Sequence, residues 1–150
     1  MQTKKIKLLT ILLLLLPLCV VLLGAGCDDD DISQSVLNGK WILIGFGDNS
    51  TNEFASEPDS EPKSSYLLFN DGEMVAYSVT NRTFDMKYSI EEGNKLSVTS
   101  GKMTLIGGDT EWGQQFLTLL GKTFGFELTE DVLRLYYEDQ KFMKLEKEIK

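Results

Sequence analysis

The sequence predicts a mostly β (α+β) fold, an antiparallel curled sheet or partly open barrel of about eight strands with one helix packed on it. Short apolar or alternating segments recur from Lys40 onward, and Asp71-Gly72 separates two of them. Only residues 109–122 show a helical period. Short strands at this spacing favour a barrel or curled sheet, and a helix can cover an open face or end of it.

The first strands are predicted around one long loop. WILIGF (41–46) is a continuous apolar run, which is typical of a buried strand. YLLFN (66–70) and EMVAYSV (73–79) flank Asp71-Gly72, which predicts a hairpin with positive φ at both turn residues. Residues 47–64 are polar and contain two prolines, so we expect a long exposed loop there.

Later strands follow from alternation. In TFDMKYSI (83–90), alternation places Phe84, Met86, Tyr88 and Ile90 on one face, as in a strand with one wet face. A turn at residues 92–94 leads to the next strand. The remaining predicted strands are KLSVTS (95–100), KMTLI (102–106), FGFEL (124–128), VLRLYY (132–137) and FMKLEK (142–147).

The single helix is predicted from an apolar stripe. Trp112, Phe116, Leu119 and Leu120 fall at i, i+4, i+7 and i+8. Asp109 or Thr110 can cap its start and Gly121 its end. Gly113 costs about 1 kcal/mol relative to alanine inside a helix. Packing of Trp112, Phe116 and Leu120 against the sheet must therefore hold the helix.

Residues 1–26 have the layout of a secretory signal peptide. Three lysines precede residue 8, an apolar run covers 8–23, and Gly24-Ala25-Gly26 closes it. A retained membrane helix is the alternative, but a span needs about 20 apolar residues. The run is shorter and Pro17 interrupts it.

Cys27 stands directly after this segment. LLGAGC (22–27) resembles the lipobox of bacterial lipoproteins, in which a peptidase cuts before the cysteine and the thiol is acylated, with palmitate among the acyl groups. The resemblance implies lipidation at Cys27 and a membrane partner reached through the acyl chains. The chain then divides into a signal peptide (1–26), an acidic tether (27–36) and a β-rich domain (37–147).

Four aspartates, Asp28 to Asp31, follow the cysteine. They resemble the acidic export signal that sends lipoproteins to the cell surface in one large Gram-negative phylum. In enteric bacteria, an aspartate after the cysteine instead retains lipoproteins at the inner membrane. We favour the outer membrane or cell surface, because four acids exceed what retention needs.

Composition excludes several function classes. Cleavage before Cys27 leaves 124 residues with 12 basic and 23 acidic side chains, a charge of −11. Nucleic acid is a poor partner for such a chain. The sequence has no histidine, and its only mature cysteine is the predicted lipid carrier. The aspartate run lacks the spacing of a calcium loop. We therefore predict no catalytic residue, cofactor or metal site, and a protein that is not an enzyme.

The order of the motifs resembles the META-domain family, the HslJ-like heat-shock lipoproteins. The opening LNGKW (37–41), the central YSIEEGNKLSVTSGKMTL (88–105), the helix and the closing FGFELTEDVLRLYY (124–137) carry the likeness over residues 37–147. Many members have a Cys-Asn pair where this chain has Thr80-Asn81. The resemblance implies a small envelope protein linked to stress, without a general catalytic activity.

Three hypotheses for function remain. The first is a non-enzymatic, lipid-anchored envelope protein with a binding or stress-related role. The second is a lipocalin-like carrier of a small apolar ligand. Lipocalin-like barrels also open with Gly-x-Trp, which Gly39 and Trp41 match. The third is a hydrolase inhibitor that presents the loop at 47–64. The identity of the ligand or protein partner stays open.

Cys27→Ser tests the predicted lipid anchor. The substitution removes the thiol that is acylated, so we expect a precursor that is neither acylated nor cleaved. Metabolic labelling with a fatty acid and the mass of the product measure both effects. A labelled or cleaved Cys27→Ser protein would contradict the lipobox assignment.

Overall fold

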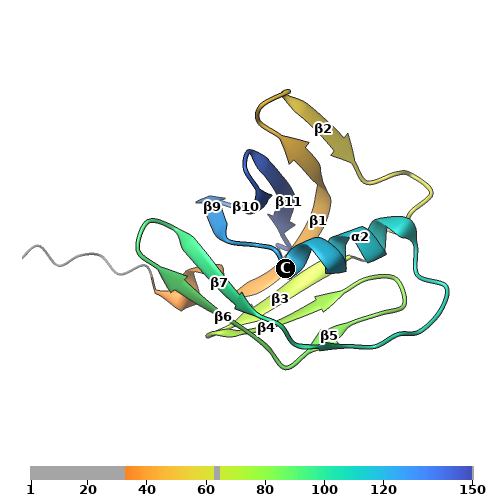
Figure 1. Ribbon diagram of the computed structural model, residues 1–150, viewed down its shortest axis with the longest axis horizontal. Coiled ribbons are helices and arrows are strands. Elements are labelled where there is room, and N and C mark those ends of the chain that lie inside the picture. Colours follow the sequence, from red (N-terminus) through yellow and green to blue (C-terminus); the bar gives the residue numbers. More distant parts are fainter. Residues whose placement is uncertain (1–32, 63–64, 150) are drawn as a thin grey trace, which may run out of the picture. The chain divides into compact units, whose positions relative to one another are not determined.

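The computed structural model describes residues 33–62 and 65–149 (Figure 1). The predicted signal peptide, Cys27 and the four aspartates lie outside the described residues. The described elements are η1 (Gln34–Leu37), β1 (Gly39–Asp48), β2 (Glu53–Ser56), β3 (Tyr66–Asn70), β4 (Glu73–Tyr77), β5 (Thr83–Phe84), β6 (Met86–Glu91), β7 (Lys95–Thr99), β8 (Lys102–Met103), α2 (Glu111–Leu120), β9 (Gly125–Thr129), β10 (Val132–Glu138) and β11 (Lys141–Lys147).

Eight strands form a closed antiparallel barrel. Their order is β11-β10-β9-β7-β6-β4-β3-β1, and β1 pairs back to β11 from Trp41–Lys147 to Asp48–Lys141. β2 adds a ninth strand to β1, and β5 pairs with β8 as a separate ribbon. The predicted mostly β fold with one helix is confirmed.

The Asp71-Gly72 hairpin is confirmed and fixes the start of the domain. Both residues have positive φ, 42° and 91°. The Asn38 side chain donates to Asp71 Oδ1 (2.7 Å) and accepts from the Asp71 N–H (2.8 Å). Because Asn38 follows η1, these two hydrogen bonds attach η1 to this hairpin.

Two buried rings also hold η1 against the barrel. Tyr88 donates its hydroxyl to the Gln34 carbonyl (2.8 Å), and Trp41 Nε1 donates to the Leu37 carbonyl (2.7 Å). Burial of Tyr88 raises the pKa of its phenol. The end of the predicted tether, from Gln34 onward, is therefore part of the folded domain.

The predicted loop at 47–64 is wrong in its first half. β1 continues to Asp48, and residues 53–56 return as β2, paired from Gly45–Ser56 to Asp48–Glu53. Two glycines of β1, Gly45 and Gly47, leave room for this pairing. A Cβ at Gly45 would collide with the Phe54 ring and a Cβ at Gly47 with the Phe142 ring, so both rings lie directly over bare backbone.

The predicted strand at 83–90 breaks in the middle. Asp85 has φ 59°, which separates β5 from β6 and shifts the side-chain alternation. Thr83 is buried instead, where its Oγ1 accepts from the Ala76 N–H (2.8 Å), and Phe84 is 36% exposed. The inward position predicted for Phe84 is wrong, whereas Met86 and Tyr88 are buried as predicted.

Helix α2 packs its apolar stripe into the barrel. Phe116 and Leu120 are fully buried, and Trp112 is half-buried with its ring edge-on to Phe46 at 4.6 Å. Thr110 is the N-cap, since its Oγ1 accepts from the Gly113 N–H (3.1 Å). A Cβ at Gly113 would lie 2.9 Å from Ser78 Cβ, so close approach of the helix explains this glycine.

The barrel ladder is shortest between β7 and β9. β7 and β9 share one residue pair, Lys95–Gly125, flanked by hydrogen bonds from Leu96 and Phe126. In Figure 1, α2 crosses between the group of β1 and β9–β11 and the group of β3–β7. Within the described part of the chain, no helix is long and apolar enough to span a membrane.

Phe116→Ala tests this packing. Removal of a fully buried aromatic ring should lower the free energy of unfolding by about 3–5 kcal/mol. Urea unfolding measures the change. Phe84→Ala is the matched control, and its exposed ring should cost within about 0.5 kcal/mol. Equal stabilities of the two variants would show that α2 is not packed as described.

Candidate functional site

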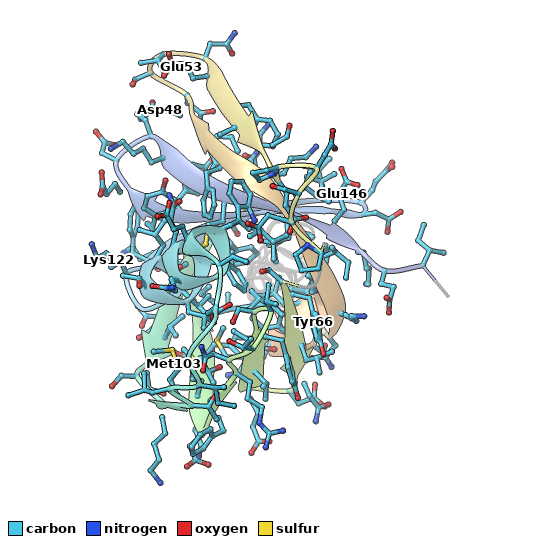
Figure 2. All side chains as sticks on the ribbon, turned by 90° about the vertical axis from the view of Figure 1, so that its right-hand side faces the viewer. Asp48, Glu53, Tyr66, Met103, Lys122 and Glu146 are labelled. Atoms are coloured by element: carbon cyan, nitrogen blue, oxygen red, sulfur yellow. The ribbon has the colours of Figure 1, made fainter. Side chains whose placement is uncertain are left out.

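A hollow with a largely apolar lining runs along α2. It has a volume of about 330 Å³ and is called the α2 groove below. Figure 2 shows its rim residue Met103 at the end of the molecule opposite Glu53, which lies at the β1–β2 hairpin. The groove is lined by Asn81, Met103, Leu105, Ile106, Gly107, Gly108, Asp109, Gln114, Leu117 and Thr118.

An apolar ridge forms one wall of the groove. Met103, Leu105 and Ile106 are 45%, 86% and 58% exposed. Single exposed apolar residues are ordinary, whereas adjacent ones beside a hollow mark interaction surfaces. The opposite wall is the face of α2 that carries Leu117, which also packs against the core. The groove therefore has one wall of exposed apolar side chains and one wall, on α2, that packs against the core.

The side-chain amide of Asn81 fixes the ridge. Its Oδ1 accepts from the Ile106 N–H (2.7 Å) and from Thr104 Oγ1 (3.2 Å). Its Nδ2 donates to the Ile106 carbonyl (3.0 Å) and to Asp109 Oδ2 (3.0 Å). Asn81 is buried, so these bonds are shielded from water. The amide thus holds both backbone groups of Ile106, as a neighbouring strand would.

Asp109 completes the network at the start of α2. Its Oδ2 accepts from Ser78 Oγ (2.5 Å) as well as from Asn81, and its Oδ1 accepts from the Thr110 N–H (3.1 Å). Burial raises the pKa of this carboxyl, but the hydrogen bonds from Ser78 and Asn81 outweigh it, so the pKa is lowered. Asp109 is therefore ionised near neutral pH and ties three segments together.

A second hollow lies on the other side of the ridge. It measures about 390 Å³ and shares Asn81 and Ile106 with the α2 groove. Its walls come from the β4–β5 connection and Thr104. Ile106 therefore stands between two hollows, where a bound partner can contact it from both sides.

The groove offers contact surface and little chemistry. Its single carboxylate, Asp109, already accepts three hydrogen bonds. In the residues that the structure describes, no group of three or more Asp, Glu, His or Cys side chains could hold a metal ion. The acidic pairs at 91–92 and 130–131 lie in or beside the β6–β7 and β9–β10 turns, away from the groove lining.

The sequence located part of this site. Asp109 and Thr110 are the two predicted candidates for the helix cap, and Thr110 is confirmed as the cap, whereas Asp109 holds the network. Ser78 and Asn81 received no predicted role. One feature of the sequence points to this position: Thr80-Asn81 stands where many META-domain proteins have a Cys-Asn pair. The predicted lipidation site, Cys27, lies outside the described residues.

Comparisons with known proteins show the fold alone. No family model and no curated protein matches the chain. An NMR structure of a protein from Burkholderia xenovorans is similar, with 17% identity, a TM-score of 0.57, and coverage of 78% of this chain and 87% of that one. A crystal structure of a DUF4847 family protein from Bacteroides vulgatus has 14% identity, a TM-score of 0.50, and coverage of 81% and 96%.

Asp109→Asn should change the acid sensitivity of the fold. Because the pKa of Asp109 is lowered by folding, its stabilisation is present at neutral pH and is lost as pH falls below the ordinary value of 3.8 through the folded value. Urea unfolding at several pH values should show Asp109→Asn less stable than the parent at neutral pH. The two stabilities should converge in acid.

Asp139→Asn is the control, because it removes the same charge from an exposed turn between β10 and β11. It should lower the free energy of unfolding at neutral pH by less than Asp109→Asn does. If Asp109→Asn and the parent are equally stable over the whole pH range, the Ser78–Asn81–Asp109 network does not stabilise the fold.

Proposed function

We propose that the protein is a non-enzymatic, lipid-anchored protein of the bacterial cell envelope, of the META (HslJ-like) type, which binds a partner through the α2 groove. The lipobox-like LLGAGC (22–27) and the motif order over 37–147 support the anchor and the family type. The observation that carries the binding role is the apolar ridge, held in place by Asn81 beside a groove of about 330 Å³.

The α2 groove lies away from η1, where the described chain begins. η1 is bonded to the Asp71 hairpin, from which β4 runs to Ser78 and the Asn81 network. The α2 groove therefore lies at the opposite end of β4 from η1. The proposed outer-membrane or surface location rests on the four aspartates that follow Cys27 in the sequence.

Charge indicates the chemistry of the occupant. The groove lining contains Asp109 and no lysine or arginine, and Glu111 lies in the first turn of α2. The mature chain has a charge of −11. Complementary charges favour encounter and fix register. We therefore assign to the groove a segment of a partner protein that combines apolar side chains with basic ones.

The lipocalin-like carrier is the second candidate. The inward-facing side chains Trp41, Leu43, Leu67, Met143 and Leu145 are fully buried in the core, so an apolar ligand would bind the α2 groove and not the barrel interior. The volume of the groove is within the range of small-molecule sites. The inhibitor hypothesis depended on a long loop at 47–64 and loses support, because 53–56 is a strand.

Leu105→Ser tests the groove. Two synthetic amphipathic helices, one of leucine and lysine and one of leucine and glutamate, serve as probes in calorimetric titrations. The lysine peptide should bind the parent more tightly than the glutamate peptide. Loss of one buried leucine contact, worth about 1.5–3 kcal/mol, should weaken lysine-peptide binding by about tenfold or more.

Val36→Ser is the matched control, because Val36 is an exposed apolar residue of η1 outside the groove. It should leave binding of the lysine peptide unchanged. Equal binding by both peptides, or equal effects of the two substitutions, would argue against the α2 groove as the docking surface. Tight binding of a small fatty acid with no peptide binding would favour the carrier.

A further inference from the structure

Two rows of side chains cross the outer face of the barrel, away from the α2 groove. Along the first, Phe54 lies opposite Gly47, Gly47 opposite Phe142, and Phe142 opposite Tyr136. Leu133, Leu135, Met143 and Leu145 point into the core. Their alternate neighbours on β10 and β11 therefore face outward.

The second row is polar and lies beside the first. Gly45 is opposite Lys144, Lys144 is opposite Arg134, and Arg134 is opposite Glu127. Two cations directly opposite each other repel. Both are compensated, because Arg134 Nη1 lies 3.2 Å from Glu127 Oε2 and Lys144 Nζ lies 3.1 Å from Glu146 Oε1. The row is therefore balanced in charge.

An aromatic cluster of Phe54, Phe142 and Tyr136 lines the first row. Phe54 is its exposed ring, at 44%, and Lys144 Nζ lies 5.8 Å from the Phe54 centroid. The Phe142 ring is buried under the Arg134 guanidinium at 4.8 Å, and it is tilted by 59° against the Tyr136 ring at 5.9 Å. Tyr136 donates its hydroxyl to Glu127 Oε2 (3.0 Å), which links the cluster to the polar row.

Two hollows adjoin on this face. One of about 250 Å³ lies beside the β1–β2 turn and one of about 270 Å³ lies over β9 and β10, and Arg134 and Lys144 line both. The first is also lined by Asp48, Asn49, Asn52, Glu53, Phe54 and Phe142, and the second by Glu127, Thr129 and Val132. Arg134 and Lys144 therefore stand between the two hollows, which together are called the trough below, and Phe54 is the exposed ring at one end of it.

We propose that this trough binds a neutral oligosaccharide. A sugar ring has an apolar C–H face that packs on an aromatic ring, and hydroxyls that both donate and accept hydrogen bonds. The trough supplies Phe54, cationic and amide donors, and the acceptors Asp48, Glu53 and Glu127. A polyanion would meet these carboxylates. Binding of oligosaccharides on a strand face is also known for small barrels.

The site is independent of the α2 groove and of the lipid anchor. None of its residues lines the α2 groove. The test uses the full-length protein in a detergent without a sugar headgroup. Calorimetric titration with maltotetraose, cellotetraose, chitotetraose and mannotetraose covers four neutral linkages. We expect at least one to bind, with an affinity that changes less than about threefold when salt is raised to about 0.5 M.

Phe54→Ala should weaken that binding by about tenfold, since it removes the exposed ring. Phe54→Leu keeps apolar volume without a flat face and should weaken binding as well, which separates stacking from any loss of fold. Phe84→Ala is the matched control, because Phe84 is also exposed beside a lysine, 5.9 Å from Lys102 Nζ. It should bind like the parent.

Three results would overturn the proposal. The first is no binding of any of the four tetrasaccharides at about 10 mM, where even a weak site of millimolar Kd is mostly filled. The second is an equal effect of Phe54→Ala and Phe84→Ala. The third is binding of polygalacturonate alone, lost at high salt, which would mean that the trough selects anions through Arg134 and Lys144.

Discussion

The core of the barrel depends on the packing of α2. Phe116 and Leu120 of the helix are fully buried in the same core cluster as the inward side chains of the strands. At the start of the helix, Trp112 packs edge-on against Phe46 of β1, and Gly113 lies close to Ser78 after β4. The first turn of α2 must therefore be held in place against the barrel.

The Ser78–Asn81–Asp109 network holds the start of α2 in place, and it also shapes the surface beside the helix. Asp109 joins the helix start to the β4–β5 connection, and Asn81 binds both backbone groups of Ile106. These bonds fix the segment that carries the exposed side chains of Met103, Leu105 and Ile106. This segment and α2 form the two walls of the α2 groove. The same hydrogen-bond network therefore holds α2 against the barrel and keeps the apolar ridge in place on the surface.

Much of the fold is predictable from the sequence, since alternation, Asp71-Gly72 and one helical stripe indicate the main strands and α2. β2 is missed because EFAS has no apolar period, and its pairing depends on Gly45 giving space to the Phe54 ring. Phe84 is misplaced because the positive φ of Asp85 interrupts the alternation. Asn81 and the outer trough are not predictable, because both depend on residues that are distant in the chain and meet only after the barrel closes.

Amide hydrogen exchange of Ile106 tests directly whether Asn81 holds the ridge. This N–H lies in a surface segment outside any described strand, and it should be protected by its hydrogen bond to Asn81 Oδ1. Asn81→Ser should remove that protection. The Leu43 N–H, bonded to the Ser65 carbonyl at 2.9 Å, should stay protected in both proteins. If the Ile106 amide exchanges in the parent as fast as in an unfolded chain, Asn81 does not hold the ridge.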